Sequence, residues 1–156
     1  MRSGRRKVLQ GTGGLAVMGL AMAAGLFKPG LARAESWNKA AFETKSFADA
    51  VKALGGSQPA ESKDIAINSP DIAENGAVVP FAIESRIPKT EAIAILVEKN
   101  PNTLAAEFEI PQGTDPWINT RVKMAQTSRV IALVKAGGKY YYGAKEVKVT
   151  LGGCGG

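Results

Sequence analysis

The stretch "TLAAEFEI", residues 103–110, decides the fold class because its apolar side chains recur with a period of two. Every second residue from Leu104 to Ile110 is apolar, and the positions between them include two glutamates. Successive side chains of a β-strand point to opposite faces, so this period predicts a strand with one buried and one solvated face. The same period recurs from Ile118 to Met124 and from Val147 to Leu151, which predicts an all-β fold.

Five less regular segments also favour strands, and turn-forming residues separate them. They are residues 64–67, 77–85, 91–98, 129–134 and 140–142. About seven strands with short connections predict an antiparallel, immunoglobulin-like β-sandwich. We expect it to span residues 63–148. Pro80 lies within one segment and cannot donate a backbone hydrogen bond, so that strand is predicted to lie at a sheet edge or to carry a bulge.

The segment before the sandwich, residues 35–62, predicts one short helix and a linker. Ser46 begins a sequence that is typical of a helix N-terminal cap. Apolar residues follow at helical spacing as far as Leu54, and the pair Gly55-Gly56 ends the pattern. The next residues, "SQPAES", are predicted to be the linker.

The charge of the chain is unevenly distributed. The net charge is +6, but all surplus basic residues precede Glu35, the first acidic residue. Residues 35–156 therefore carry no net charge, and no basic stripe with interleaved aromatic residues remains. This distribution argues against a nucleic-acid-binding protein.

The first 34 residues are predicted to be an export signal. Arg5 and Arg6 precede an uncharged stretch, residues 8–27, and the small residues Ala32 and Ala34 mark a cleavage site. The arginine pair in "GRRKVLQ" resembles a twin-arginine signal, while a general secretory signal and an uncleaved membrane anchor remain as alternatives. We expect a periplasmic mature chain without a stable membrane anchor.

The residue types present limit the chemistry of the folded body. The chain has no histidine and one cysteine, so it lacks the commonest general base and cannot build a zinc or copper thiolate site. Glu107 and Glu109 share a strand face, and we interpret them as solvated surface. The sequence therefore predicts that the body is not an enzyme and that it holds no metal or cofactor.

The C-terminal arm, residues 149–156 or "VTLGGCGG", carries the single cysteine at its tip. Cys154 is flanked by four glycines: Gly152, Gly153, Gly155 and Gly156. A thiolate is a strong nucleophile that can bear a cargo, and glycines leave no side chain to obstruct entry into a narrow active site. The tip thus predicts a flexible covalent carrier arm. The alternatives are an incidental tail and an intermolecular disulfide in a structural or adhesive sandwich subunit.

Three stretches of the sequence resemble the SoxY family, the sulfur carriers of the periplasmic thiosulfate-oxidising system. They are "KEVKVTLGGCGG" (residues 145–156), "IAENGAVVPF" (72–81) and "EKNPNTLAAEF" (98–108). The resemblance implies that Cys154 holds the sulfur intermediates and that the glycines around it supply the mobile arm.

The resemblance also implies partners. SoxY proteins pair with SoxZ, a similar sandwich without its own signal, and the folded pair can be exported together. SoxAX, a haem protein, oxidatively joins thiosulfate to the carrier cysteine, and SoxB hydrolyses the terminal group to sulfate. SoxCD oxidises the remaining sulfur in some systems. Haem and metals then belong to the partners, and no cofactor is expected in this chain.

Overall fold

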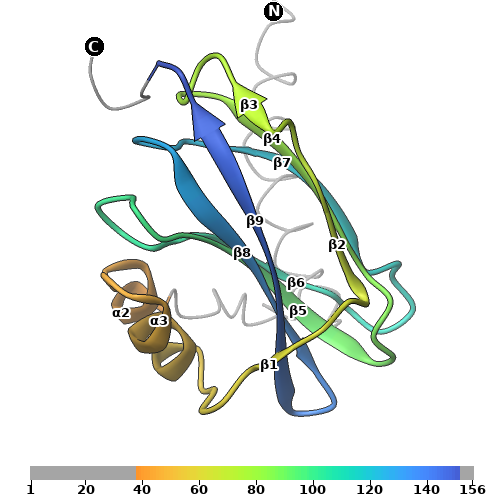
Figure 1. The fold of residues 1–156 in the computed structure, drawn as a ribbon. Coiled ribbons are helices and arrows are strands. Elements are labelled where there is room, and N and C mark those ends of the chain that lie inside the picture. Colours follow the sequence, from red (N-terminus) through yellow and green to blue (C-terminus); the bar gives the residue numbers. More distant parts are fainter. Residues whose placement is uncertain (1–37, 152–156) are drawn as a thin grey trace, which may run out of the picture. The chain divides into compact units, whose positions relative to one another are not determined.

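The computed structural model describes residues 38–151, which form two β-sheets and two short helices (Figure 1). None of the helices in this range is long and apolar enough to cross a membrane. The elements are α2 (Lys39–Phe42), α3 (Phe47–Ala53), β1 (Ala60–Glu61), β2 (Ile65–Asn68), β3 (Ile72–Ala73), β4 (Val79–Ser85), β5 (Thr90–Val97), β6 (Leu104–Glu109), β7 (Trp117–Val122), β8 (Ser128–Ala136) and β9 (Lys139–Val149).

The two sheets form a β-sandwich. The larger sheet has the order β1-β9-β8-β5-β6, with β3 also paired to β9, and the smaller sheet has the order β2-β4-β7. All long strands pair antiparallel, while the two-residue strands β1 and β3 run parallel to β9. The predicted fold class, an all-β sandwich preceded by a short helix, is confirmed.

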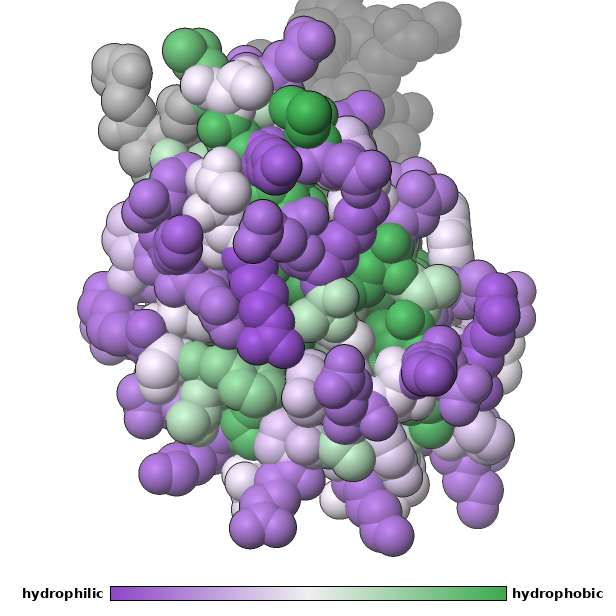
Figure 2. Space-filling model, viewed as in Figure 1, coloured by the Kyte–Doolittle hydropathy of each residue, from purple (hydrophilic) through white to green (hydrophobic). Residues whose placement is uncertain are grey.

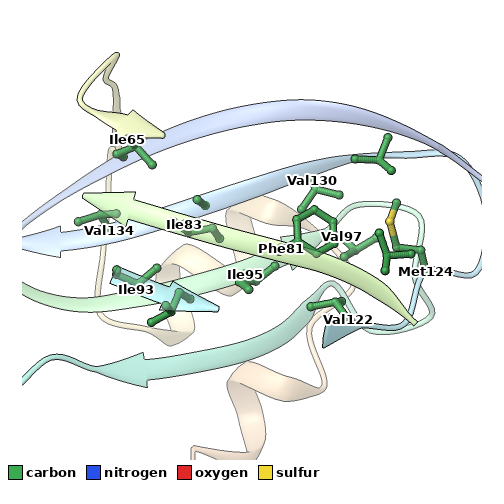
Figure 3. Packing of buried hydrophobic residues seen from close by; sticks show 14 of the residues in the cluster. Ile65, Phe81, Ile83, Ile93, Ile95, Val97, Val122, Met124, Val130 and Val134 are labelled. Carbon is green, nitrogen blue, oxygen red and sulfur yellow. The ribbon is translucent and has the colours of Figure 1, made fainter. Parts of the chain in front are cut away.

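The core lies between the sheets and is built from the alternating residues of the strands. Figure 3 shows Phe81 and Ile83 of β4 pointing toward side chains of the facing sheet. Those facing side chains include Ile93, Ile95 and Val130. All five side chains are fully buried, and burial of each contributes about 1.5–3 kcal/mol.

A second apolar cluster lies on the outer face of the larger sheet, where α2 and α3 cover it (Figure 1). Leu96 of β5 and Leu133 of β8 pack there with Val51 of α3. Residues 93–97 of β5 and 130–134 of β8 are therefore buried on both faces, and no polar residue occupies an alternate position there. That is why residues 91–98 and 129–134 show a less regular pattern than "TLAAEFEI".

The predicted helix is α3, and its ends agree with the sequence signals. Ser46 is the N-terminal cap, and its hydroxyl oxygen accepts a 3.1 Å hydrogen bond from the Asp49 N–H. Gly55 follows the helix with a φ of 86°, a left-handed conformation that favours glycine. The Tyr140 hydroxyl then donates to the Leu54 carbonyl and fastens this end to the sheet.

The prediction for Pro80 was wrong. Strand β4 is the central strand of the smaller sheet, and its pairing with β7 has no register shift. The pairing of β2 with β4 ends at Asn68 opposite Ala82, so β2 does not reach Pro80. A central strand thus accommodates a proline because its neighbour on one side is shorter.

Three strand features differ from the sequence prediction. The segment 140–142 and the first three residues of the segment 147–151 belong to one strand, β9, which ends at Val149. Its middle residues Gly143 and Ala144 had interrupted the pattern. Gly143 packs so closely on β2 that a Cβ atom would lie 3.2 Å from Ile65. The strands β1 and β3 were not predicted, since two residues carry no periodicity, and β1 lies within the predicted linker.

Candidate functional site

The residues that the sequence singles out lie outside the described part of the chain. They are Arg5, Arg6, Ala32 and Ala34 near the N-terminus and Gly152, Gly153, Cys154, Gly155 and Gly156 at the C-terminus. The structure does describe where the C-terminal arm begins. We call residues Val149–Leu151 the arm root, and the contacts of the arm root form the candidate site.

Strand β9 carries the chain out of the larger sheet toward the arm root. Its pairing with β8 ends where Val147 lies opposite Ser128. Beyond that point β9 pairs in parallel with β3, and Ala73 lies opposite Val149 (Figure 1). The Thr150 N–H donates to the Ala73 carbonyl over 3.0 Å. A short parallel ladder therefore extends the strand past its main partner.

Thr127 holds Val149 by its side chain. The Val149 N–H donates to the Thr127 Oγ1 over 2.9 Å, on the connection between β7 and β8. Since β3 holds Thr150 and Thr127 holds Val149, successive residues of the arm root are bound to different parts of the fold.

The turn after β3 completes the attachment. The Gly76 N–H donates to the Leu151 carbonyl over 2.7 Å, and the Thr150 hydroxyl donates to the Glu74 carbonyl over 3.1 Å. The Gly76 carbonyl accepts a 2.7 Å hydrogen bond from the N–H of Met124, whose side chain is fully buried. Gly76 thus links Leu151, the last described residue, to the core.

An ion pair connects the start of this turn segment to β9. The Lys145 Nζ lies 2.9 Å from the Asp71 carboxylate and also donates to the Ser69 carbonyl over 2.6 Å. The hydrogen bond from Lys145, reinforced by its positive charge, holds the pKa of Asp71 below its ordinary value. Asp71 is highly exposed, so this pair orients the segment more than it stabilises the fold.

The two glutamates that we interpreted as solvated surface, Glu107 and Glu109, are both exposed. Glu107 lies beside Tyr140, and partial loss of solvent there, with the neighbouring charge of Glu109, raises the pKa of Glu107. Within residues 38–151 no group of three or more histidine, cysteine or acidic side chains is placed to hold a metal ion.

A surface cavity of about 670 Å³ lies at the opposite end of β4 from the arm root. Residues 85–91 line one side, and residues 110–114 with Pro116 line the other. Its charged lining residues are Arg86, Lys89 and Glu91, and it contains no cysteine or histidine.

Sequence reasoning missed the residues that hold the arm root. Ala73 and Gly76 act through backbone atoms, which any residue type could supply, and Thr127 is an ordinary loop threonine. One signal was available: the stretch "IAENGAVVPF" contains Ala73 and the turn pair Asn75-Gly76, and the Asn75 side chain accepts from the Ala77 N–H over 2.8 Å.

Comparisons with known proteins agree on one family. The family model described as "Sulfur oxidation protein SoxY" matches residues 50–154. Among solved structures, the sulfur carrier protein SoxY from Chlorobium limicola f thiosulfatophilum is 40% identical with a TM-score of 0.60. That match covers 66% of this chain and 94% of the other chain.

Other comparisons add nothing about function. A superoxide reductase (neelaredoxin) from Ignicoccus hospitalis is 14% identical, with a TM-score of 0.49 and coverage of 55% of this chain and 79% of that one. This similarity is too low to support an argument. No curated protein matches the sequence. The match to the SoxY family model, by contrast, covers the β-sandwich, the arm root and Cys154. With most of its length matched to the family, the chain belongs to the SoxY family of sulfur oxidation proteins.

Proposed function

We propose that this chain is a covalent carrier of sulfur intermediates in thiosulfate oxidation and that Cys154 bears the cargo. The observation that supports the proposal most is the family match, which extends to residue 154 and so includes the only cysteine of the chain. The solved relative is itself a sulfur carrier protein. The chain is then a substrate platform, and the catalytic groups belong to partner enzymes. Replacing Cys154 with serine tests the proposal.

Loading of the carrier is an oxidation. The Cys154 thiolate and the outer sulfur of thiosulfate form a sulfur–sulfur bond, and two electrons pass to a haem partner of the SoxAX type. The product is a cysteine S-thiosulfonate with one negative charge, where the two reactants together carried three. Thiolate nucleophilicity supports this assignment, since Cys154 is the only thiol in the sequence.

Release of sulfate is a hydrolysis. A partner of the SoxB type adds water across the bond between the outer sulfur and the sulfonate group. Sulfate and two protons leave, and Cys154 keeps a persulfide anion. Where a SoxCD-type enzyme is present, the persulfide sulfur is oxidised before a second hydrolysis. This chain's part is to present the same cysteine to each enzyme in turn.

The arm root supports this role by giving the arm a fixed origin. The hydrogen bonds of Val149, Thr150 and Leu151 to the fold leave three residue steps between Leu151 and Cys154. Three extended residues reach about 10 Å. The sulfur therefore has to meet its enzymes within that distance of the arm root.

The partner subunit is the subject of one prediction. Mature protein expressed together with a SoxZ-type chain should co-purify with it at equal stoichiometry, since family resemblance implies a heterodimer. Size-exclusion chromatography with mass determination measures the complex. A stable monomer that does not bind such a chain in a pull-down would contradict the heterodimer.

The export signal is the subject of another prediction, and the periplasm is the proposed location. Cleavage should follow Ala34, so the N-terminal sequence of the mature protein should begin at Glu35. Replacing Arg5 and Arg6 together with lysine should leave the precursor in the cytoplasm, as cell fractionation would detect. Normal export of this double variant would instead indicate the general secretory route.

A further inference from the structure

Three exposed apolar side chains surround the arm root. Within residues 38–151, four large apolar side chains are strongly exposed: Ile72 (57%), Val78 (52%), Trp117 (54%) and Leu151 (67%). Ile72, Val78 and Leu151 lie on the arm root or on the segment that binds it, whereas Trp117 pairs with Glu84 near the other end of β4. Figure 2 shows apolar side chains at the end of the molecule where β3 and the end of β9 lie, with hydrophilic side chains between them. Single exposed apolar residues are ordinary, but a group at one position indicates a contact surface.

The three side chains belong to one connected unit. Ile72 lies opposite Lys148 in the parallel ladder, and the Gly76 N–H binds the Leu151 carbonyl. Val78 follows Gly76 in the turn and leads directly into β4, where Val79 is fully buried. Because the same hydrogen bonds fasten the arm root and this segment, the apolar side chains keep a constant position relative to the start of the arm.

The length of the arm limits how far an enzyme's catalytic group can lie from this surface. Cys154 lies three residues beyond Leu151, a reach of about 10 Å in an extended chain. A catalytic group that sits about that far below an enzyme's surface can meet the sulfur only if the enzyme's surface contacts the arm root. An enzyme with a catalytic group at that depth would therefore cover Ile72, Val78 and Leu151.

We propose that Ile72, Val78 and Leu151 form a docking collar for the partner enzymes, an inference that rests on the proposed carrier function. The matching surface is an apolar rim around the mouth of a narrow channel that admits the residues Gly152–Gly156. Exposed polar residues, Glu74, Lys148 and Thr150, border the collar. An apolar centre with a polar border is the ordinary anatomy of a protein interface.

The small size of the collar suits a transient partner rather than a permanent one. A carrier has to release one enzyme before it serves the next, and three side chains supply far less area than a stable heterodimer requires. A permanent subunit seated on the collar would also block the approach of every enzyme to the arm. The SoxZ-type subunit should therefore bind a different face.

The test compares two collar changes with the same kind of change elsewhere. The double variant Ile72→Thr/Val78→Thr keeps β-branched side chains and puts a hydroxyl in place of one apolar branch at each position, and Trp117→Thr is the control at the other end of β4. Each protein is paired with its SoxZ-type subunit and loaded with thiosulfate, and a SoxB-type hydrolase then releases sulfate. The collar variant should raise KM about tenfold with kcat unchanged, because docking contacts bind ground state and transition state equally. Trp117→Thr should match the wild type.

Leu151→Gln is a second variant, which keeps the backbone bond to Gly76 while changing the collar, and it should also raise KM. An unchanged KM in both collar variants, with an active wild type, would overturn the collar and leave the carrier function intact. Loss of pairing with the SoxZ-type subunit in the collar variants alone would also overturn it, since the surface would then belong to the permanent interface. A loaded wild type that releases no sulfate would contradict the carrier function and the collar together.

Discussion

Cys154→Ser should abolish sulfate release from thiosulfate in a reconstituted system that contains the partner subunit and the partner enzymes. A serine hydroxyl is not ionised near neutral pH, and an oxygen in place of sulfur cannot form the sulfur–sulfur bond that loading requires. No second cysteine can take its place, because Cys154 is the only one in the chain. Turnover should therefore fall to the background of the partner enzymes without carrier.

Intact mass spectrometry separates this result from a folding defect. Wild-type protein incubated with thiosulfate and the haem partner should gain a thiosulfonate adduct, and Cys154→Ser should stay unmodified. Both proteins should give the same circular dichroism spectrum and the same melting temperature. If sulfate release persisted in Cys154→Ser, the carrier proposal would be wrong however good the family match.

The fold could be predicted from the sequence wherever one face of a strand meets water. At the end of β6, Phe108 packs on the core while Glu107 and Glu109 are exposed, as the alternation predicts. At its start the alternation fails, because after a register shift Leu104 packs with the helices and Ala105 packs on the core. Ser46 and Gly55 mark the ends of α3. The prediction failed where the pairing of neighbours decides the outcome. Pro80 is compatible with a central strand only because the neighbouring strand β2 is short. The residues around Pro80 give no information about the length of β2, so this could not be predicted.

The candidate site also has a part that the sequence predicts and a part that it does not. Residue types alone predict that Cys154, the single thiol of the chain, can carry a cargo, whereas the sulfur cargo is implied by the family resemblance and stays a prediction. The attachment of the arm root cannot, because Gly76, Ala73 and Leu151 act through backbone N–H and carbonyl groups. The docking collar needs both kinds of information: the sequence supplies the reach of the arm, and the structure supplies the exposed side chains at its origin.

Replacing both Gly153 and Gly155 with valine should slow sulfate release about 100-fold or more, the size of effect expected when a reacting group is misplaced by about 1 Å. Valine is stiff at χ1 and excludes backbone conformations that glycine adopts without cost. It also widens the chain on both sides of Cys154, so the sulfur can no longer be threaded into a narrow channel. The same pair of changes to alanine, which adds a Cβ without branching, should slow release by a smaller factor.

The fold of the valine variant should be unaffected. The two apolar clusters that stabilise the described residues are built from side chains between Ala41 and Val149, and neither substitution changes any of them. The melting temperature and binding to the SoxZ-type subunit should therefore equal those of the wild type. Docking through the collar should also survive, so the loss should fall mainly on kcat, whereas the collar variants change KM. An intermolecular disulfide would tolerate bulky neighbours, and a valine variant that turned over at the wild-type rate would show that Cys154 is not threaded into the partner enzymes.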